Sequence, residues 1–334
     1  MAAHWFGMPQ ENKLHKLAEG LPMIVHTQVI QQPSTKDPLE ESLHALLPDA
    51  EMQPQALHRA MRHAVFSGGK RIRPRLLLTV AAACAAAEAE LELARCAACA
   101  VELVHSASLV HDDLPCFDDA AMRRGRPTVH KVYGEAVAVL AGDALLTRAF
   151  EVLAESPPRL ARRAMRIVRL LGQATGSREG IIGGQSLEQG PTPSGQGQAK
   201  TEALVCEPDI LSRYHAMKTA ALFRLAAEAG ATAAGATDAP AWSEVGQCLG
   251  LAYQLADDLC DVYGNVDSAG KPVRRDAALG RPNAAMLVGE QRTRSRLNAL
   301  LEQSITLTRT LAADPVPLVA LIEELAVHFT RTTT

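Results

Sequence analysis

Apolar residues recur at intervals of three and four along most of the chain, a spacing that predicts amphipathic helices. Leu57, Met61 and Val65 form one such stripe, and the pair Gly68-Gly69 is expected to end that helix. Strict alternation of apolar and polar positions, the signal for strands, is almost absent, and aromatic residues make up only 4% of the chain. The pattern therefore predicts an all-α fold. Further segments with helical spacing or composition are 39–47, 76–100, 101–111, 135–155, 160–175, 209–230, 241–264, 292–312 and 317–328.

Two stretches lack a helical period and divide the chain. Residues 1–36 mix polar and apolar positions and run into a turn-forming segment, so we interpret them as an N-terminal arm. Residues 189–207 combine Gly, Pro, Ser and Gln, which predicts a surface loop. We interpret 37–334 as a single helical domain, because we find no internal repeat and the 47% hydrophobic content can supply a sizeable core.

Charge and cysteine content narrow the classes of function. The 34 Lys and Arg residues against 37 Asp and Glu residues give a formal charge of −3, which argues against nucleic acid as a partner. The seven cysteines lie mostly in Ala-rich or Leu-rich runs and are expected to be reduced thiols of a cytoplasmic protein. Cys96 and Cys99 form a CxxC without a second ligand pair, which favours core packing over a metal site.

Neither a transmembrane segment nor export is expected. The longest apolar stretch, 76–87, is shorter than the roughly 20 residues that span a bilayer. His4, Glu11 and Lys13 interrupt the region where a secretory signal requires an unbroken apolar run. The sequence therefore predicts a soluble protein of the cytoplasm.

The chain contains two clusters of aspartates. The second cluster, residues 254–261 (QLADDLCD), lies in a predicted helix. Asp257 and Asp261 are four residues apart and so share one helix face, with Gln254 one turn earlier. Carboxylates gathered against apolar residues cannot all stay ionised without a cation, and oxygen ligands suit Mg²⁺. On spacing alone, a solvated stripe of charge is equally compatible with this pattern.

The first cluster, residues 111–119 (HDDLPCFDD), is less regular. Asp112 and Asp118 are six residues apart and would point about 240° from each other on an unbroken helix. Pro115 is expected to end or kink the helix and to bring Asp118 back towards Asp112. The dipeptide His111-Asp112 also occurs in HD-type phosphohydrolases, but that interpretation requires further spaced histidines.

Basic residues accompany both clusters. Residues 123–126 (RRGR) follow the first cluster, and Lys271 follows the second. Residues 68–74 (GGKRIRP) place three cations behind a glycine turn, where side chains and amides can converge on an anion, although a solvated basic run is the alternative. Lys218 is an isolated cation on an otherwise apolar helix. Carboxylates, magnesium and arginine together are the components of a diphosphate site.

Five motifs follow one another along the chain: GGKRIRP (68–74), DDLPCFDD with RRGRPTVH (112–130), GGQSLEQ (183–189), MKTAAL (217–222), and YQLADDLCDVYG with GKPVRRDAALGRPN (253–283). Taken in order, they resemble the trans-isoprenyl diphosphate synthase family from about residue 43 to the C-terminal region. Within that family the motif sequences are most similar to bacterial geranylgeranyl diphosphate synthases of carotenoid pathways. The resemblance implies an all-α isoprenoid synthase domain around a deep central apolar cavity, in a protein that forms a homodimer.

The resemblance implies a magnesium-dependent, head-to-tail condensation of isopentenyl diphosphate with an allylic diphosphate, giving geranylgeranyl diphosphate. Two or three Mg²⁺ ions would be held by Asp112, Asp118, Asp257 and Asp261. Isopentenyl diphosphate would be bound by Lys70, Arg73, His105 and Arg124. The allylic diphosphate would be bound by Arg123, Lys218, Thr219, Gln254 and Lys271, with Lys218 acting in catalysis beside the aspartates Asp112, Asp118 and Asp257.

Product length is expected to depend on the helix that precedes Asp112. Ala107 and Ser108 stand where farnesyl synthases usually carry an aromatic floor, so the resemblance implies space for a twenty-carbon product. Replacing Ala107 with Phe or Tyr should then shorten the product to fifteen carbons.

Four positions depart from the family pattern. Ala120 and Ala121 stand where many bacterial relatives have aspartates, Glu188 replaces the usual Asp, and Asn283 replaces a common Thr. None of these changes removes an implied metal ligand, so an active enzyme is favoured.

Other functions remain open at this point. A farnesyl diphosphate synthase would belong to the same family. A class I terpene cyclase would share the helical fold and the aspartates, but it would lack GGKRIRP and normally carry an Asn-Ser-Glu triad in place of the second cluster. A non-catalytic subunit would usually lose one aspartate cluster, whereas both are present here.

Overall fold

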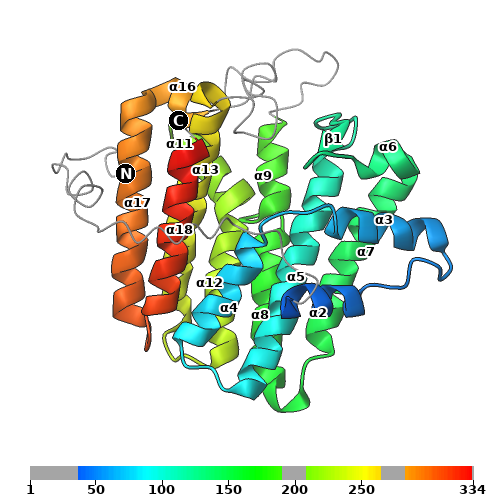
Figure 1. Cartoon of the computed structure of the whole chain (residues 1–334), viewed down its shortest axis with the longest axis horizontal. Coiled ribbons are helices and arrows are strands. Elements are labelled where there is room, and N and C mark those ends of the chain that lie inside the picture. The colour runs from blue at the N-terminus through cyan, green and yellow to red at the C-terminus, as the bar shows by residue number, and fades with distance from the viewer. Residues whose placement is uncertain (1–36, 190–207, 265–282, 333–334) are drawn as a thin grey trace.

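The computed structural model describes residues 37–189, 208–264 and 283–332, and helices make up almost all of their regular structure (Figure 1). The prediction of an all-α fold is confirmed. Among the described residues, the strands are the two-residue β1 (Met122–Arg123) and β2 (Arg126–Pro127), which pair antiparallel. The helices are α2 (Pro38–Leu46), α3 (Gln55–Val65), α4 (Ile72–Ala83), α5 (Glu88–Asp112), α6 (Val129–Tyr133), α7 (Glu135–Ala154), η2 (Pro158–Leu160), α8 (Ala161–Thr175), α9 (Ile181–Glu188), α11 (Pro208–His215), η3 (Ala216–Ala220), α12 (Ala221–Ala234), η4 (Ala239–Ala241), α13 (Trp242–Tyr263), α16 (Ala284–Val288), α17 (Glu290–Leu311) and α18 (Val316–Thr332).

Local sequence signals explain several helix ends. The Asp37 carboxylate accepts a hydrogen bond of 2.9 Å from the backbone N–H of Leu39, and Pro38 occupies the first turn of α2. Gly235 ends α12 in the left-handed conformation, with φ of 82°. α5 ends at Asp112, three residues before Pro115, as the sequence predicts.

The helical block expected over 76–100 is interrupted. α4 ends at Ala83 and α5 begins at Glu88, with Ala85 in the left-handed conformation at φ 57°. The carbonyl of Ala83 accepts hydrogen bonds from the backbone N–H groups of Ala313 (2.9 Å) and Asp314 (3.1 Å), which connect α17 to α18. A tertiary contact therefore caps α4 at a point where the alanine-rich sequence has no local stop signal.

The segment expected as one helix over 209–230 contains a π-helical turn, η3, between α11 and α12. This turn carries Lys218 and Thr219. Two glycines allow neighbouring helices to approach it, because a Cβ on Gly184 would lie 2.6 Å from the Lys218 backbone nitrogen, and a Cβ on Gly250 would lie 2.5 Å from the Ala220 Cα. Such π-helical turns are frequent at functional sites.

The core of the molecule is centred on α5, which packs against α4, α7 and α12 (Figure 1). Buried residues from α2 through α18 form one hydrophobic cluster. By length and composition α5 could cross a membrane, but 72% of its apolar window is buried within the fold, as is usual for the core helix of a globular protein.

Several predicted features lie outside the described residues. They are the N-terminal arm 1–36, most of the loop 189–207, and Lys271. The cysteines of the described ranges are free thiols. Cys99 of the CxxC is buried, and burial raises the pKa of its thiol to about 12, which agrees with core packing.

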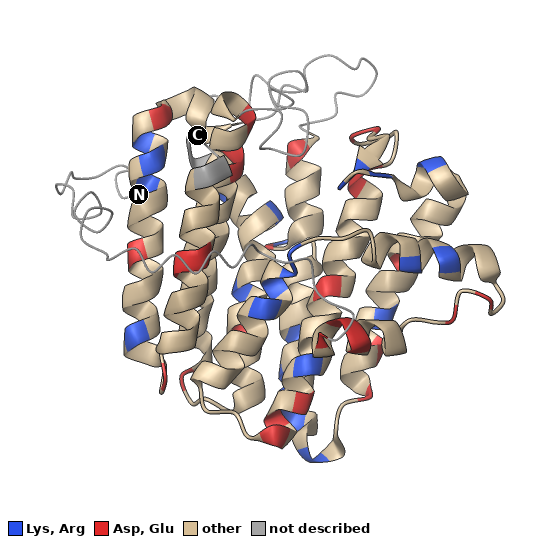
Figure 2. Cartoon of the chain, viewed as in Figure 1, with Lys and Arg blue, Asp and Glu red and all other residues tan. Residues whose placement is uncertain are grey.

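Charged residues of both signs are interspersed over the helices (Figure 2). Acidic positions recur near the upper ends of α9 and α13. Glu188 is the last residue of α9, and Asp257 and Asp261 lie in the last two turns of α13. The ends of these helices border the cavity described next.

Candidate active site

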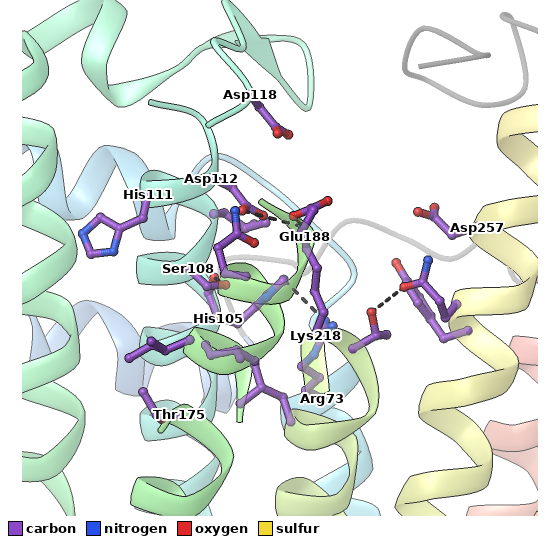
Figure 3. A pocket seen from close by; sticks show the side chains of 18 of the residues that line it. Arg73, His105, Ser108, His111, Asp112, Asp118, Thr175, Glu188, Lys218 and Asp257 are labelled. Atoms are coloured by element: carbon purple, nitrogen blue, oxygen red, sulfur yellow. Dashed lines mark hydrogen bonds and ion pairs between the residues drawn. The ribbon is translucent and has the colours of Figure 1, made fainter. Parts of the chain in front are cut away.

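A cavity of about 400 Å³ opens among the ends of α5, α9, η3 and α13 (Figure 3). Its upper part is lined by charged and polar side chains, and apolar residues such as Leu146 and Leu222 line other parts of its wall. Most of the residues predicted to bind substrate or metal, or to set product length, line it: Arg73, His105, Ser108, Asp112, Asp118, Arg123, Arg124, Lys218, Thr219, Gln254, Asp257 and Asp261.

The aspartates lie on two facing walls. Asp112, at the end of α5, and Asp118, in the following loop, project from one side, while Asp257 of α13 projects from the other (Figure 3). The backbone N–H of Asp118 donates to the carbonyl of Asp112 at 3.0 Å, so the chain turns back after the helix as expected from Pro115. Because of this turn, both carboxylates line the same cavity although they are six residues apart.

The carboxylates of these walls are suited to a divalent cation. Burial raises the pKa of Asp112 to about 6, although Lys218 opposes this shift, so ionisation of Asp112 requires compensating positive charge. Among the described residues no three His, Cys, Asp or Glu side chains gather closely enough to hold a metal ion by themselves. Mg²⁺ characteristically keeps waters and takes one or two carboxylates together with substrate phosphate oxygens, so this open arrangement fits that ion.

Lys218 lies between carboxylates from two helices. Its ammonium forms a very short ion pair with Glu188 of α9, and it lies 3.9 Å from Oδ1 of Asp112. The hydroxyl of Tyr214 donates to the other Glu188 oxygen at 3.0 Å. Glu188 is nearly fully buried, so the ammonium is held at the cavity wall by a desolvated partner.

Thr219 and Gln254 connect η3 to α13. The Thr219 hydroxyl donates a short hydrogen bond to the side-chain oxygen of Gln254. Arg123, in β1, reaches the cavity from the loop side, and its guanidinium is paired with Asp113 at 2.7 Å. The predicted allylic-site residues within the described ranges therefore converge on one region.

A second, more basic group lies beside α4. The guanidinium of Arg73 stacks over the ring of Phe223 at 4.8 Å, and its Nη1 lies 3.4 Å from Nε2 of His105. Arg124 donates a short hydrogen bond to the carbonyl of Gly68. Burial lowers the pKa of His105 well below its ordinary value, with Arg73 adding to the effect, so this imidazole is neutral.

Lys70 does not line the described cavity. Its ammonium lies 2.5 Å from Nε2 of His328 on α18, a residue 258 positions later in the chain. The structure therefore brings Arg73, His105 and Arg124, but not Lys70, to the wall of this cavity.

The two positions predicted to control product length differ in their surroundings. Ser108 lines the cavity, and its hydroxyl donates to the His105 carbonyl at 2.8 Å. Ala107 is fully buried and does not line the cavity. It lies one helical turn before His111, which contacts the Val139 carbonyl of α7, so Ala107 occupies the side of α5 that faces α7.

Sequence reasoning missed Tyr214, Tyr253, Gln185 and Thr175, all of which line the cavity. Tyr214 stands four residues before Lys218, and Tyr253 directly precedes Gln254, so their helical spacing was the available signal. Thr175, near the bottom of the cavity in Figure 3, had no such signal because it comes from the last turn of α8.

Known proteins resemble this chain over most of its length. The sequence profile of the polyprenyl synthetase family matches residues 54–316. A geranylgeranyl diphosphate synthase of Cereibacter sphaeroides is 44% identical over 253 residues, covering 75% of this chain and 81% of the relative. One from Rhodobacter capsulatus is 43% identical over 262 residues, covering 78% and 84%.

Solved structures agree with this assignment. The crystal structure of an FPP/GFPP synthase from Zymomonas mobilis has a TM-score of 0.71 at 30% identity, covering 86% of this chain and 94% of that one. A geranyltransferase from Legionella pneumophila also gives 0.71 at 27% identity, covering 89% and 94%. The chain therefore belongs to the polyprenyl synthetase family.

Proposed function

We propose that this protein is a magnesium-dependent prenyltransferase that condenses isopentenyl diphosphate with allylic diphosphates to give geranylgeranyl diphosphate. The observation that carries the proposal is the pair of facing aspartate walls flanked by basic side chains around one cavity. The 43–44% identity to two geranylgeranyl diphosphate synthases supports the substrate class and the product.

The allylic diphosphate is assigned to the upper part of the cavity. Asp112 and Asp118 on one wall, and Asp257 with Asp261 on the other, would hold Mg²⁺. Bound there, the metal supplies positive charge that stabilises the departing diphosphate. Arg123 and Lys218 bind the diphosphate oxygens directly, and their positions are fixed before the charge develops, which favours the transition state.

Isopentenyl diphosphate is assigned to Arg73, His105 and Arg124, with Lys70 beside them. Charge-assisted hydrogen bonds from guanidinium groups orient its diphosphate, and the neutral His105 donates one N–H. Its double bond then attacks the allylic carbon, and the departed diphosphate takes the proton that the new chain loses. No dedicated basic histidine is required for this step.

We also propose that the protein is a cytoplasmic homodimer and that its product is a precursor of carotenoids. The free thiols of the described residues support a reducing compartment. Large exposed apolar side chains on α6 and α7, Val132, Val139 and Leu140, support a subunit interface. The sequence resemblance supports the assignment to carotenoid synthesis.

Product length tests the proposal most directly. Purified protein, Mg²⁺ and isopentenyl diphosphate are incubated with dimethylallyl, geranyl or farnesyl diphosphate, and the products are separated by chain length. We expect the twenty-carbon diphosphate from each primer and no turnover with EDTA. A fifteen-carbon product would identify a farnesyl synthase, a cyclic hydrocarbon a terpene cyclase, and no product a non-catalytic subunit.

In the same assay, Ser108→Phe is expected to shift the product towards fifteen carbons because Ser108 lines the cavity. The family resemblance predicts the same shift for Ala107→Phe. Ser108→Phe projects into the cavity, so its thermal stability should remain close to that of the parent protein. Ala107→Phe overfills a fully buried position and should in addition lose about 1–3 kcal/mol of stability. Unchanged twenty-carbon output from both variants would remove α5 from the control of length.

A further inference from the structure

The paired aspartates of the two clusters have different surroundings. Asp112 and Asp257, the first member of each pair, line the cavity. Asp113 and Asp258, the second members, do not line it, and their side chains are only 5% and 1% exposed. A buried carboxylate must be paired or hydrogen-bonded, so the partners of these two residues indicate their role.

Asp113 is engaged by a residue of the diphosphate site. Nε of Arg123 donates to both carboxylate oxygens at 2.9 Å, and Nη2 of Arg123 lies 2.7 Å from Oδ1. These contacts occupy one edge of the guanidinium and fix its direction, while Arg123 itself lines the cavity. Charge-assisted pairs of this geometry hold their partners strongly.

Asp258 is engaged by a second residue of the same site. Its Oδ1 accepts from Nε2 of Gln254 at 2.8 Å, and its Oδ2 accepts from the backbone N–H of Ala284 at 2.8 Å. Because the Gln254 amide nitrogen is turned to Asp258, its oxygen faces Thr219, whose hydroxyl donates to it. The carboxylate therefore sets the orientation of an amide and, through it, of a hydroxyl, both of which line the cavity.

We infer that Asp113 and Asp258 are positioning residues of the allylic diphosphate site, acting through Arg123 and through Gln254 with Thr219, and not as metal ligands. This inference rests on the proposed function and deepens it. Each aspartate pair thereby combines one carboxylate for the cation with one for the protein groups that bind the anion. Asp119 provides a contrast, since it pairs with Lys131 at 3.1 Å and neither residue lines the cavity.

Isosteric Asp-to-Asn variants test the inference. In Asp113→Asn and Asp258→Asn, we expect the KM for geranyl diphosphate to rise about tenfold or more, because a charge-assisted hydrogen bond is lost. The KM for isopentenyl diphosphate and the Mg²⁺ concentration for half-maximal rate should stay within about twofold of the parent values, because substitutions have nearly independent effects at sites that share no partners. Asp112→Asn and Asp257→Asn should instead raise the Mg²⁺ requirement, and Asp119→Asn should behave as the parent.

Calorimetric binding of inorganic diphosphate separates this inference from the proposed reaction, since it requires no turnover. Without Mg²⁺, Asp113→Asn should bind diphosphate about tenfold more weakly than the parent, and Asp113→Asn in an Arg123→Gln background should add no further loss. Parent-like diphosphate binding, or a raised Mg²⁺ requirement equal to that of Asp112→Asn, would overturn the inference whether or not the protein makes the expected product. If the fully buried Asp258→Asn does not fold, Asp113→Asn decides the outcome alone.

Discussion

At the scale of single residues, ionisation of the buried Asp112 carboxyl destabilises the folded protein. The carboxyl has an ordinary pKa of 3.8, and burial raises it to about 6 in the folded protein, against the opposing influence of Lys218. The folded state therefore binds this proton more tightly than the unfolded chain. The protonated Asp112 carboxyl therefore contributes fully to the free energy of unfolding below about pH 4. That contribution, about 3 kcal/mol, is lost as pH rises through about 6.

We therefore expect Asp112→Asn to be more stable than the parent protein at pH 7.5 in EDTA. The difference in free energy of unfolding should shrink when pH is lowered to 4.5, because the parent carboxyl is then protonated. Chemical unfolding at both pH values measures it. Mg²⁺ added at pH 7.5 should stabilise the parent more than the variant. A difference that does not change with pH would contradict the raised pKa.

At the scale of elements, Arg71, which lies between Lys70 and Arg73 in the sequence, links three helices. Its side chain is only 3% exposed and pairs with Glu40 of α2 at 2.7 Å and with Glu102 of α5 at 2.6 Å. It also donates to the Val65 carbonyl at the end of α3 at 2.8 Å. Glu40 lies before residue 54, where the match to the family profile begins, so the partner that α2 provides for Arg71 lies outside that match.

Arg71→Met should lower the free energy of unfolding by about 3–5 kcal/mol, since two buried carboxylates lose their cation. The triple variant that adds Glu40→Gln and Glu102→Gln should recover much of the loss. Denaturant titration measures both.

A matched control lies one turn further along α4. Arg75 pairs with Glu324 at 2.8 Å, but both side chains are more than a third exposed. Arg75→Met is therefore expected to cost no more than about 1 kcal/mol. Equal losses for Arg71→Met and Arg75→Met would show that burial of the first pair carries no special weight.

The sequence predicts long elements better than their interruptions. The segments 135–155 and 241–264 correspond closely to α7 and α13, because their period is local and complete. The split between α4 and α5 depends on Ala313 and Asp314, far away in the chain, and the turn η3 depends on helices packed against it.

The same limit applies within the site. The spacing of Asp257 and Asp261 on α13 predicted a shared helix face, and Pro115 predicted the turn that brings Asp118 back towards Asp112. The spacing was equally compatible with a solvated stripe of charge, and the family resemblance was needed to predict that these carboxylates line one cavity. The partners of Lys70 and Asp258 could not be predicted, because His328 and Ala284 come from other parts of the chain. Tertiary neighbours, which a single sequence does not encode locally, decide these contacts.

At the scale of the whole molecule, the neighbouring helices α6 and α7 carry exposed apolar side chains. Val132 of α6 and Val139 and Leu140 of α7 are 42–56% exposed. Figure 1 shows α6 and α7 on the right of the molecule. Exposed apolar residues that gather on neighbouring elements mark protein interfaces. The side that carries α18 lies at the opposite end of this view.

We expect the protein to elute as a dimer, and Leu140→Glu to shift it towards the monomer, because a buried charge would oppose the apolar contact. Light scattering after size exclusion measures the mass. Val316→Glu, at a 70% exposed position on α18, is the matched control and should remain dimeric. Retention of the dimer by Leu140→Glu would place the interface elsewhere.

The continuity of α5 has a consequence for inhibitor design. His105 and Asp112 belong to the two proposed diphosphate sites, and seven residues of one buried helix separate them. A helix rises about 1.5 Å per residue, so their levels differ by about 10 Å. Because both residues belong to α5, this difference in level is fixed by the helix. A bivalent compound with two anionic heads, one for each proposed site, would bind more tightly than either head alone, because binding of the first head raises the effective concentration of the second.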